Sequence, residues 1–519
     1  MVKLNMYGTG FTLQAAIFIN CSMAFILFGY DQGVFSGIIE NEDFLSVMGN
    51  PGDSLTGIIV SIYNLGCFAG CGVNFLIGDW LGRRRAMWFA MFWVIVGATL
   101  QTSAFGVPHM MVGRFVAGIG TGIETSTVPM YQAELCEADK RGKLVCSEPL
   151  LTGVGIVISY FFDYGMSFVG GQIAWRLPIA CQMVFAIVVI LLVFGLPESP
   201  RYCYQKGREA EGLQILSDVY GKPKDDPKIL AEQADIVDTL ALERRQGNSQ
   251  WKAIFKQDEV CTGQRVLLAY GMQFMNQLGG INLVVYYVPT VLKNNVGLSY
   301  DLSMILGGCV QICFAVGSLF PTIFADKVGR RRPMMVGSLG LGICMMMVSI
   351  LLSFKGTEKG HETASAAVAF FFIYMLIHGA SVNCIPWCYV PEILPLHARA
   401  KGTAIGVSSN WIWNFFVVMI TPIIINRLQW QAYLIFMCMN YAFIPLIYFC
   451  YPEVAKLSLE EIDFLFTNPD KSAVKVSKEL RREIKKYGEA RTAMQHLRGQ
   501  DDSEKSPVEG SNSEQVEKV

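Results

Sequence analysis

The segment GDWLGRRR at residues 78–85 returns in altered form as ADKVGRRR at residues 325–332. Each copy follows an apolar run of membrane-crossing length, at residues 54–77 and 302–325. An aspartate, a glycine and three arginines therefore recur at the same place after two separate runs. The repeat indicates that the chain is built from two related halves.

A second repeated pair supports this division. Glu134 lies seven residues before Arg141, and Glu392 lies seven residues before Arg399. Each pair follows the fourth apolar run of its half. Two matches at equivalent positions are not expected by chance.

The composition is that of a membrane protein. Of 519 residues, 52% are hydrophobic and 16% are charged, whereas a soluble domain carries about 25% charged residues. The mean hydropathy is +0.38. A bilayer core about 30 Å thick takes roughly 20 helical residues to cross. Apolar runs of suitable length lie at residues 12–36, 54–77, 86–104, 110–132, 145–166, 174–196, 264–292, 302–325, 334–354, 364–390, 402–424 and 431–451.

These runs predict an all-α membrane protein with 12 transmembrane helices in two six-helix bundles, so the lipid bilayer is an expected partner. Repeated halves of this kind hold a substrate between them near the membrane midplane. The expected domains are an N-terminal bundle (1–196), a cytoplasmic linker with helices (197–263), a C-terminal bundle (264–451) and a cytoplasmic tail (452–519), disordered after about residue 500.

Lys and Arg residues predict the orientation, because they concentrate in cytoplasmic loops. The short loops on one side hold Arg83–Arg85, Lys140, Arg141, Lys143, Lys327, Arg330–Arg332, Arg399 and Lys401, whereas those on the other side hold Lys293, Lys355, Lys359 and Arg427. We therefore expect both termini and the central linker to be cytoplasmic.

Several functions are excluded by composition. Lys+Arg (42) and Asp+Glu (43) nearly cancel, which removes the electrostatic case for nucleic-acid binding. The 15 cysteines lie mostly in apolar runs, and the five histidines form no zinc-spaced cluster. No phosphate-binding loop and no nucleophile–base pair stands out, so we expect neither a metal, a cofactor nor an enzyme.

Charged residues at the ends of the runs are candidates for a cytoplasmic gate. Acidic and basic groups facing one another there could hold this side closed in one conformation, and anchoring of topology is the alternative role. The candidates are Asp79, Arg83, Arg84, Glu134, Arg141, Glu198, Arg201, Asp326, Arg330, Arg331, Glu392 and Arg399.

Charges inside the apolar runs need a functional reason, since each costs about 2.5–3.5 kcal/mol at a helix centre. Asp31 and Arg114 are expected to form a proton-coupling pair, because an aspartate that loses its counter-ion in a dry cavity binds a proton. A permanent structural ion pair is the alternative. Glu124, Glu148 and Asp163 are weaker candidates, and solvated helix ends explain Glu148 and Asp163.

The second half instead carries amides and aromatic residues within its runs. Neutral amides both donate and accept hydrogen bonds, which suits a ligand covered in hydroxyl groups. Hydrogen bonding between helices is the alternative role. The candidate substrate-binding residues are Gln273, Asn276, Gln277, Asn282, Tyr286, Tyr287, His378, Asn383, Trp387, Asn410 and Trp411.

Taken together, these residues resemble the sugar-porter family of the major facilitator superfamily, in its fungal branch. The resemblance runs from about residue 25 to residue 466. Its motifs are Gly29–Gly37, the two Gly-Arg-Arg loops, Gly113-Arg114, Pro129–Glu134, Pro197–Arg201, Asn276–Asn282, Tyr286-Tyr287, Pro386-Trp387, Asn410-Trp411 with Asn414, Tyr451–Glu453, and Leu459–Asp463.

The resemblance implies a twelve-helix fold and alternating access. It also implies a sugar held by residues matching Gln273, Gln277, Asn282, Trp387 and Asn410. In proton-coupled relatives, the residues matching Asp31 and Arg114 form the coupling pair.

The sequence departs from the family pattern in the expected pocket. Asn276 replaces the first of two glutamines, and Pro149 replaces a sugar-binding glutamine. His378 and Asn383 stand where hexose carriers more often have an aromatic residue and a glycine. A histidine near the cavity could meet a carboxylated sugar, and packing on a neighbouring helix is the alternative. These changes weaken a plain glucose assignment.

We therefore expect a plasma-membrane transporter that imports a monosaccharide, a hexose or a pentose, by proton symport. The alternatives are a proton-independent sugar facilitator, a carrier of a sugar acid or polyol, and a non-transporting sugar sensor. Location in a vacuolar or endosomal membrane is the alternative to the plasma membrane.

Overall fold

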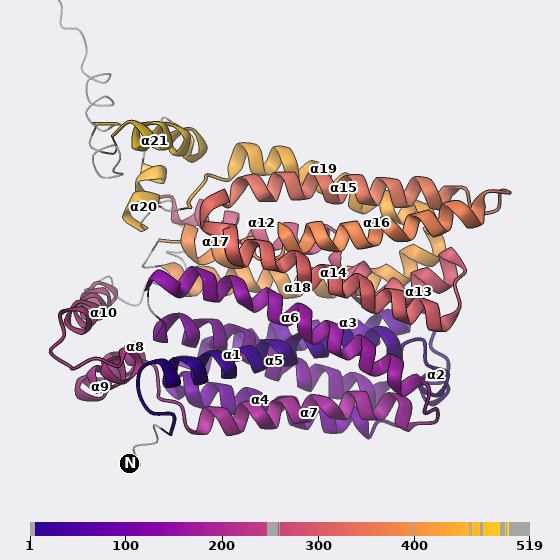
Figure 1. Cartoon of the computed structure of the whole chain (residues 1–519), viewed down its shortest axis with the longest axis horizontal. Coiled ribbons are helices and arrows are strands. Elements are labelled where there is room, and N and C mark those ends of the chain that lie inside the picture. Colours follow the sequence, from indigo (N-terminus) through magenta and orange to yellow (C-terminus); the bar gives the residue numbers. More distant parts are fainter. Residues whose placement is uncertain are drawn as a thin grey trace, which may run out of the picture.

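The computed structural model describes residues 6–136, 138–245, 258, 260–395, 398–455, 457, 459–467, 471–487, 494, 496 and 497. Across these ranges the regular structure is helical, with no strand. Figure 1 shows long helices stacked side by side in two groups that follow the order of the chain. The tail predicted to be disordered after about residue 500 lies outside the described residues.

The first group holds six long helices joined by short loops. Helix α5 packs against α3 and α4, and α1 packs against α6 and α7. Their bounds are α1 (Phe11–Ile38), α3 (Asp53–Leu81), α4 (Arg83–Thr102), α5 (Val107–Leu135), α6 (Ala138–Ser167) and α7 (Ile173–Phe194).

The second group also makes six crossings, but two of them are broken. The seventh apolar run forms α12 and α13 with a π-helical turn, and the tenth forms α16 and α17. Each run still makes the single crossing that the sequence predicts, and the breaks are a feature that the apolar runs do not reveal. The bounds are α12 (Thr262–Leu278), α13 (Ile281–Val291), η1 (Leu292–Val296), α14 (Tyr300–Val328), α15 (Arg331–Ser353), α16 (Gly360–Ala380), α17 (Ile385–Ile393), α18 (Arg399–Leu428) and α19 (Ala432–Cys450).

Eight segments of the described chain are long and apolar enough to cross a membrane, and the last, Lys401–Cys450, holds both α18 and α19. The remaining crossings fall outside these segments because they are less apolar or shorter. Helix α5 carries Arg114 and Glu124, α4 begins with three arginines, and α12 and α13 are each too short alone.

Short helices gather at the two ends of the bundles. Figure 1 places the N-terminal side of α1 at the same end as α8–α10 and α20–α21, and α2 at the opposite end. Their bounds are α2 (Glu42–Val47), α8 (Pro200–Gln205), α9 (Glu209–Tyr220), α10 (Pro227–Arg245), α20 (Leu459–Thr467), α21 (Ala473–Tyr487) and the 3-10 turn η3 (Gln429–Gln431). We call the first end the linker end and the second the α2 end.

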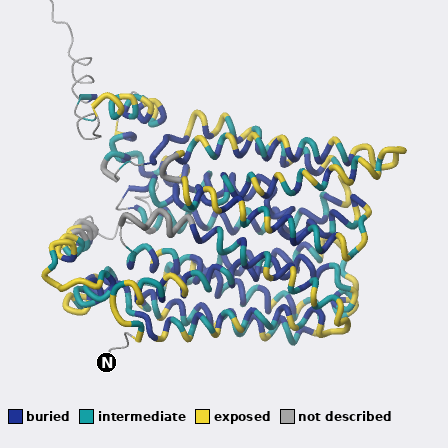
Figure 2. The backbone as a smooth tube through the Cα atoms, viewed as in Figure 1, coloured by how far each residue is buried: buried dark blue, intermediate teal, exposed yellow. Residues whose placement is uncertain are grey.

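The two bundles meet along α3–α18 and α6–α14. Tyr160 on α6 donates a hydrogen bond to the Val285 carbonyl on α13 at 2.5 Å. At the α2 end, Glu40 accepts from Thr290 at 2.6 Å and pairs with Lys293 at 3.0 Å. Figure 2 shows the buried residues concentrated on the faces turned toward neighbouring helices. Side chains that line the contact between bundles are therefore shielded from solvent.

Candidate functional site

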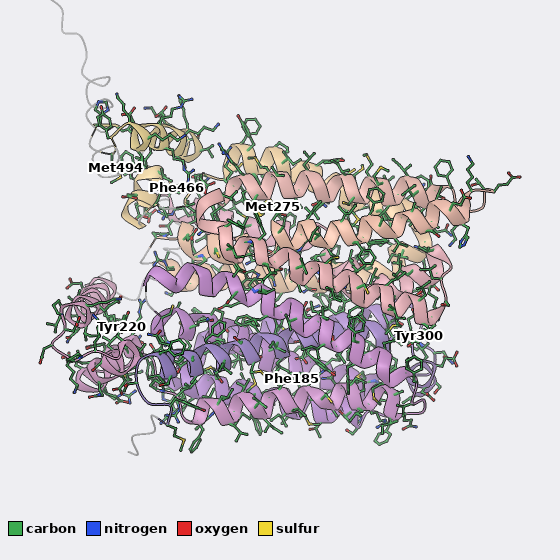
Figure 3. The ribbon with its side chains drawn as sticks, viewed as in Figure 1. Phe185, Tyr220, Met275, Tyr300, Phe466 and Met494 are labelled. Carbon is green, nitrogen blue, oxygen red and sulfur yellow. The ribbon has the colours of Figure 1, made fainter. Side chains whose placement is uncertain are left out.

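The break between α12 and α13 places the amide residues of the seventh crossing. Gly280 has φ +99°, a left-handed value that favours glycine, and a Cβ there would lie 2.9 Å from the Phe436 ring. The Gly279 carbonyl, freed from the helix, accepts hydrogen bonds from Tyr374 and Asn440, both at 2.9 Å. Helices α16 and α19 thus hold the break open. Figure 3 labels Met275 on α12, next to Asn276 and four residues before the break.

Two amides that flank this break form one cluster with an amide of α18. The Gln277 side-chain nitrogen donates to the Asn410 side-chain oxygen on α18 at 2.5 Å. The Asn282 nitrogen donates to the Gln277 oxygen, also at 2.5 Å. The structure therefore brings together Gln277, Asn282 and Asn410, three of the residues that the family resemblance implies for the substrate site.

Other polar groups nearby are buried but have no hydrogen-bond partner. Both side-chain atoms of Gln273, the Asn276 oxygen, the Tyr286 hydroxyl and the Trp411 nitrogen are in this state among the described residues. Each of these residues is at most 4% exposed. Because a buried polar group without a partner costs free energy, these atoms can bind a polar ligand at a gain. Tyr287 differs, since its hydroxyl donates to the Val418 carbonyl at 3.1 Å.

The tenth-crossing candidates lie in different surroundings. The His378 ring is stacked on Tyr374, with centroids 6.2 Å apart, and lies 6.0 Å from Phe314. Both of its nitrogens are buried without a partner in the described chain. Asn383 donates to the Ser318 hydroxyl on α14 at 3.3 Å. His378 and Asn383 thus contact α14 side chains.

Trp387, on α17, is half-buried and packs against the apolar cluster of the first bundle. It contributes a large aromatic surface at the contact between bundles. The hydrogen bonds of the amide cluster join Gln277, Asn282 and Asn410 and do not include Trp387.

Asp31 and Arg114 lie in the same buried region without a direct ion pair within 4.0 Å. Arg114 donates to the carbonyls of Ile59 and Val60, at 3.3 and 2.7 Å. The Asp31 oxygen Oδ2 lies 3.3 Å from the Tyr63 hydroxyl and 3.4 Å from the Thr121 hydroxyl, whereas Oδ1 has no partner. In this conformation Asp31 and Arg114 therefore do not form the direct ion pair that the alternative requires.

Tyr63 is the residue that joins the two, and the sequence reasoning missed it. Its hydroxyl contacts Asp31, and the Arg114 guanidinium carbon lies 4.7 Å from its ring centroid. Arg114 also lies over the Phe35 ring at 3.9 Å. Tyr63 is fully buried on α3. A tyrosine inside an apolar run carries no charge to signal it, so only the packing reveals its position.

The interpretation of Glu148 and Asp163 as solvated helix ends was wrong. Both side chains are buried, each 5% exposed, and Glu124 is 2% exposed. Both oxygens of Glu124 and of Asp163, and one of Glu148, have no described partner. The reason is packing: α6, which carries Glu148 and Asp163, packs against both α1 and α14.

At the linker end, the first bundle holds the gate candidates in one network. Arg83 pairs with Glu134 at 3.0 Å. Glu198 accepts the backbone N–H groups of Arg83 and Arg84 at 3.0 and 3.3 Å. Burial raises the pKa of the Glu198 carboxyl, and the backbone donors of Ser199, Arg84 and Arg83 oppose that shift. Glu198 thus connects the α3–α4 loop to the end of α7.

The second bundle repeats this network residue for residue. Arg330 pairs with Glu392 at 3.0 Å. Glu453 accepts the backbone N–H groups of Arg330 and Arg331 at 2.9 and 3.0 Å. Glu453 was absent from the candidate gate residues, although Pro452-Glu453 after the twelfth run matches Pro197-Glu198 after the sixth. The internal repeat was the signal that could have found it.

Each of these gate ion pairs joins residues of one bundle, not of two. Arg399 donates to the Leu394 carbonyl at 3.4 Å, and Arg201 lies in the first turn of α8. The side chains of Asp79, Arg141 and Asp326 lie outside the described residues. The described pairs therefore brace each bundle at the linker end.

Comparison with known proteins identifies relatives over nearly the whole chain. Residues 16–466 match the family model described as "Sugar (and other) transporter". The chain is 40% identical over 468 residues to the MFS-type transporter oryC of Aspergillus oryzae, covering 89% of this chain and 87% of that protein. It is 33% identical over 471 residues to the sugar transporter STL1 of Saccharomyces cerevisiae, covering 88% and 82%.

Among solved structures, the fold is similar to that of the proton:xylose symporter XylE bound to 6-bromo-6-deoxy-D-glucose. The TM-score is 0.75 at 23% sequence identity, over 88% of this chain and 99% of that one. The twelve-crossing arrangement in two bundles is therefore the major facilitator fold, as the sequence predicts.

Proposed function

This chain belongs to the sugar (and other) transporter family, the sugar porters of the major facilitator superfamily, and we propose that it imports a monosaccharide by proton symport. It is a multi-pass membrane protein. The substrate lies between the bundles, which open alternately to the two sides of the membrane. The relative named a sugar transporter, STL1, supports the substrate class.

The observation that carries the proposal is the set of buried amide, phenol and indole groups without partners. Gln273, Asn276, Tyr286 and Trp411 offer neutral donors and acceptors around the Gln277–Asn410 bond. A monosaccharide presents several hydroxyl groups that can both donate and accept. A neutral polyhydroxylated ligand therefore satisfies these groups without bringing a charge into the bilayer.

The proton half of the proposal is supported by Asp31. One of its oxygens contacts two hydroxyl groups, the other has no partner, and Arg114 is close without being bonded to it. Such a carboxyl exchanges a proton when movement of the bundles changes its distance from Arg114. Cytoplasmic termini belong to the same proposal on the basis of the Lys and Arg distribution. A plasma-membrane location belongs to it as the expectation for the family.

The test is uptake in a host stripped of its own sugar carriers. Labelled glucose, xylose, arabinose, galacturonate and glycerol are offered, each with and without a protonophore. Uptake of one sugar that collapses with the protonophore is the expected result. Uptake that survives the protonophore identifies a facilitator. Transport of galacturonate or glycerol alone changes the substrate class. A blank panel with the protein at the cell surface contradicts the proposal and favours a sensor.

A further inference from the structure

We propose that Glu124 is a second proton-binding group, which exchanges its proton with Asp31 on the linker-end side of the substrate site. The inference rests on the proposed symport. It assigns a role to a carboxyl group that is not part of the Asp31–Arg114 pair.

The first observation is the state of the Glu124 side chain. It lies within α5, is 2% exposed, and neither carboxyl oxygen has a hydrogen-bond partner in the described chain. A buried carboxylate without a donor or a cation is very costly, and such a group is stabilised by binding a proton. A polar residue with no structural partner inside a membrane helix is a functional candidate.

The second observation is the position relative to Asp31. Thr121, which contacts Asp31, lies one helical turn before Glu124 on α5. Phe28 lies one turn before Asp31 on α1, and it lines the same space as Glu124. The two helices run in opposite directions. The step from Asp31 back to Phe28 on α1 and the step from Thr121 on to Glu124 on α5 therefore both lead toward the linker end. Glu124 is therefore the next carboxyl after Asp31 in that direction.

The third observation is the space that Glu124 faces. Ala24, Phe25 and Phe28 of α1, with Thr125 and Val128 of α5, line a narrow gap beside the carboxyl that leaves no room for a water molecule. The Thr125 hydroxyl donates to the Thr121 carbonyl at 2.9 Å. The Thr121 hydroxyl, which contacts Asp31, and the Thr125 hydroxyl, which lines this gap, thus lie on successive turns of α5.

The contact between bundles closes this region. The Trp411 ring on α18 packs edge-on against Phe28, with centroids 5.7 Å apart, and Trp411 is fully buried. When the second bundle moves away, this contact is lost and water reaches the Phe28 side of the space. Glu124 then releases its proton to water at the linker end.

Within the part of the chain that the structure describes, the titratable groups around Glu124 do not offer it a counter-ion. Helix α1 presents Asp31, and α3 presents Tyr63 and Cys71, whose thiol contacts the Gly122 carbonyl at 3.4 Å. Where α4 packs on this part of α5, it presents Ala90 and Val94. Arg114 lies about 15 Å along α5 in the other direction, ten residues at 1.5 Å each. Proton binding is thus the simplest way to neutralise Glu124.

The experiment compares the full-length protein with Glu124→Gln in liposomes. Infrared difference spectra across a pH titration record the C=O stretch of protonated carboxyl groups, which needs no substrate. Internal pH is recorded while glucose or xylose, whichever the uptake panel shows to be carried, is added. Counterflow of the same labelled sugar reports a folded carrier. Glu209→Gln, an exposed change on α9, is the matched control.

The proposal predicts that Glu124→Gln removes one protonated-carboxyl band. Sugar-driven proton uptake falls about tenfold or more, as for loss of a proton-transfer group, while counterflow continues. Glu124→Asp restores the band and part of the proton uptake, which excludes misfolding as the cause.

Two results overturn the proposal while leaving the symport intact. One is an unchanged band with normal proton uptake in Glu124→Gln. The other is a raised half-saturation concentration for counterflow with normal proton uptake, which makes Glu124 a sugar contact. Absence of proton uptake in the wild-type protein is a different outcome: it contradicts the proposed symport, and the relay with it.

Discussion

Asp31 and Arg114 both contact Tyr63 and do not bond to each other directly. The Tyr63 hydroxyl is 3.3 Å from Asp31, and its ring lies under the Arg114 guanidinium. Arg114 is meanwhile held by two backbone carbonyls of α3. A small movement of α1 against α3 therefore changes the environment of Asp31 while Arg114 stays in place.

We expect Asp31→Asn to abolish uphill sugar accumulation and to leave counterflow in place. The amide keeps the size and the hydrogen-bonding contacts to Tyr63 and Thr121, but it cannot take up and release a proton. The measurement is the ratio of internal to external labelled sugar, with Asp53→Asn, an exposed position at the start of α3, as the control. Accumulation that persists in Asp31→Asn removes Asp31 from the coupling step.

Gln277→Ala is expected to raise the half-saturation concentration about tenfold, since losing one or two hydrogen bonds is worth about 1.4 kcal/mol. Gln277 bonds both Asn410 and Asn282, so its removal disturbs all three amides. Gln14→Ala is the control, because it loses one hydrogen bond, to the Val219 carbonyl, at the far end of α1. Equal half-saturation concentrations in the two variants argue against this cluster as the substrate site.

At the scale of elements, the α3–α4 turn and its counterpart between α14 and α15 are built alike. Gly82 and Gly329 have φ values of +82° and +90°. A Cβ at either would lie 2.8 or 2.6 Å from the carboxyl of Glu198 or Glu453. The glycines thus let a glutamate reach the first N–H groups of the next helix. The same device braces both bundles.

Gly82→Ala and Gly329→Ala are each expected to lower stability by about 1–3 kcal/mol, because a left-handed backbone is strained for alanine and the glutamate must move. Thermal unfolding of the purified protein in detergent is the measurement. Gly72→Ala is the control, since a Cβ there meets nothing within 4 Å. Unfolding temperatures of all three variants equal to that of the wild type contradict this account of the turns.

The elements themselves follow from the sequence to different degrees. Long apolar runs predict the crossings because the bilayer requires about 20 apolar helical residues. The break at Gly280 was not predictable from hydropathy, since it depends on Tyr374 and Asn440, which bind the freed Gly279 carbonyl from distant helices. Asn383 likewise faces α14 because of the break after α16.

At the scale of the whole molecule, the two bundles are joined at the α2 end by polar contacts. Glu40, just after α1, accepts from Thr290 and pairs with Lys293 of the second bundle. The described gate pairs at the linker end remain within single bundles. This conformation therefore has a polar latch between bundles at the α2 end.

Glu40→Gln is expected to increase the population open at the α2 end by up to about fivefold, because a partly exposed ion pair contributes roughly 0.2–1 kcal/mol. Spin labels at Asp53 and Asp301, exposed at this end of the two bundles, report the opening by distance measurement. The exposed Cys438 and Cys450 are first replaced by serine.

Glu211→Gln is the matched control for the latch, since its ion pair with Arg208 is exposed and lies outside the contact between bundles. An equal distance distribution in Glu40→Gln and Glu211→Gln shows that the latch does not affect the population open at the α2 end.

The internal repeat made much of the whole molecule predictable. It indicated two bundles, the paired Gly-Arg-Arg turns and the Glu134 and Glu392 positions. It did not reveal Tyr63, which carries no charge, or the burial of Glu148 and Asp163. Those depend on which helices become neighbours, and hydropathy along one chain does not contain that information.

The central claim, that sugar and proton move together, is tested most directly by the pH of a lightly buffered cell suspension. The cells lack their own carriers and express this protein, and the sugar that the uptake panel identifies is added at time zero. We predict an immediate alkalinisation of the medium, absent in cells expressing Asp31→Asn. Entry of the labelled sugar with no change in external pH would contradict the claim.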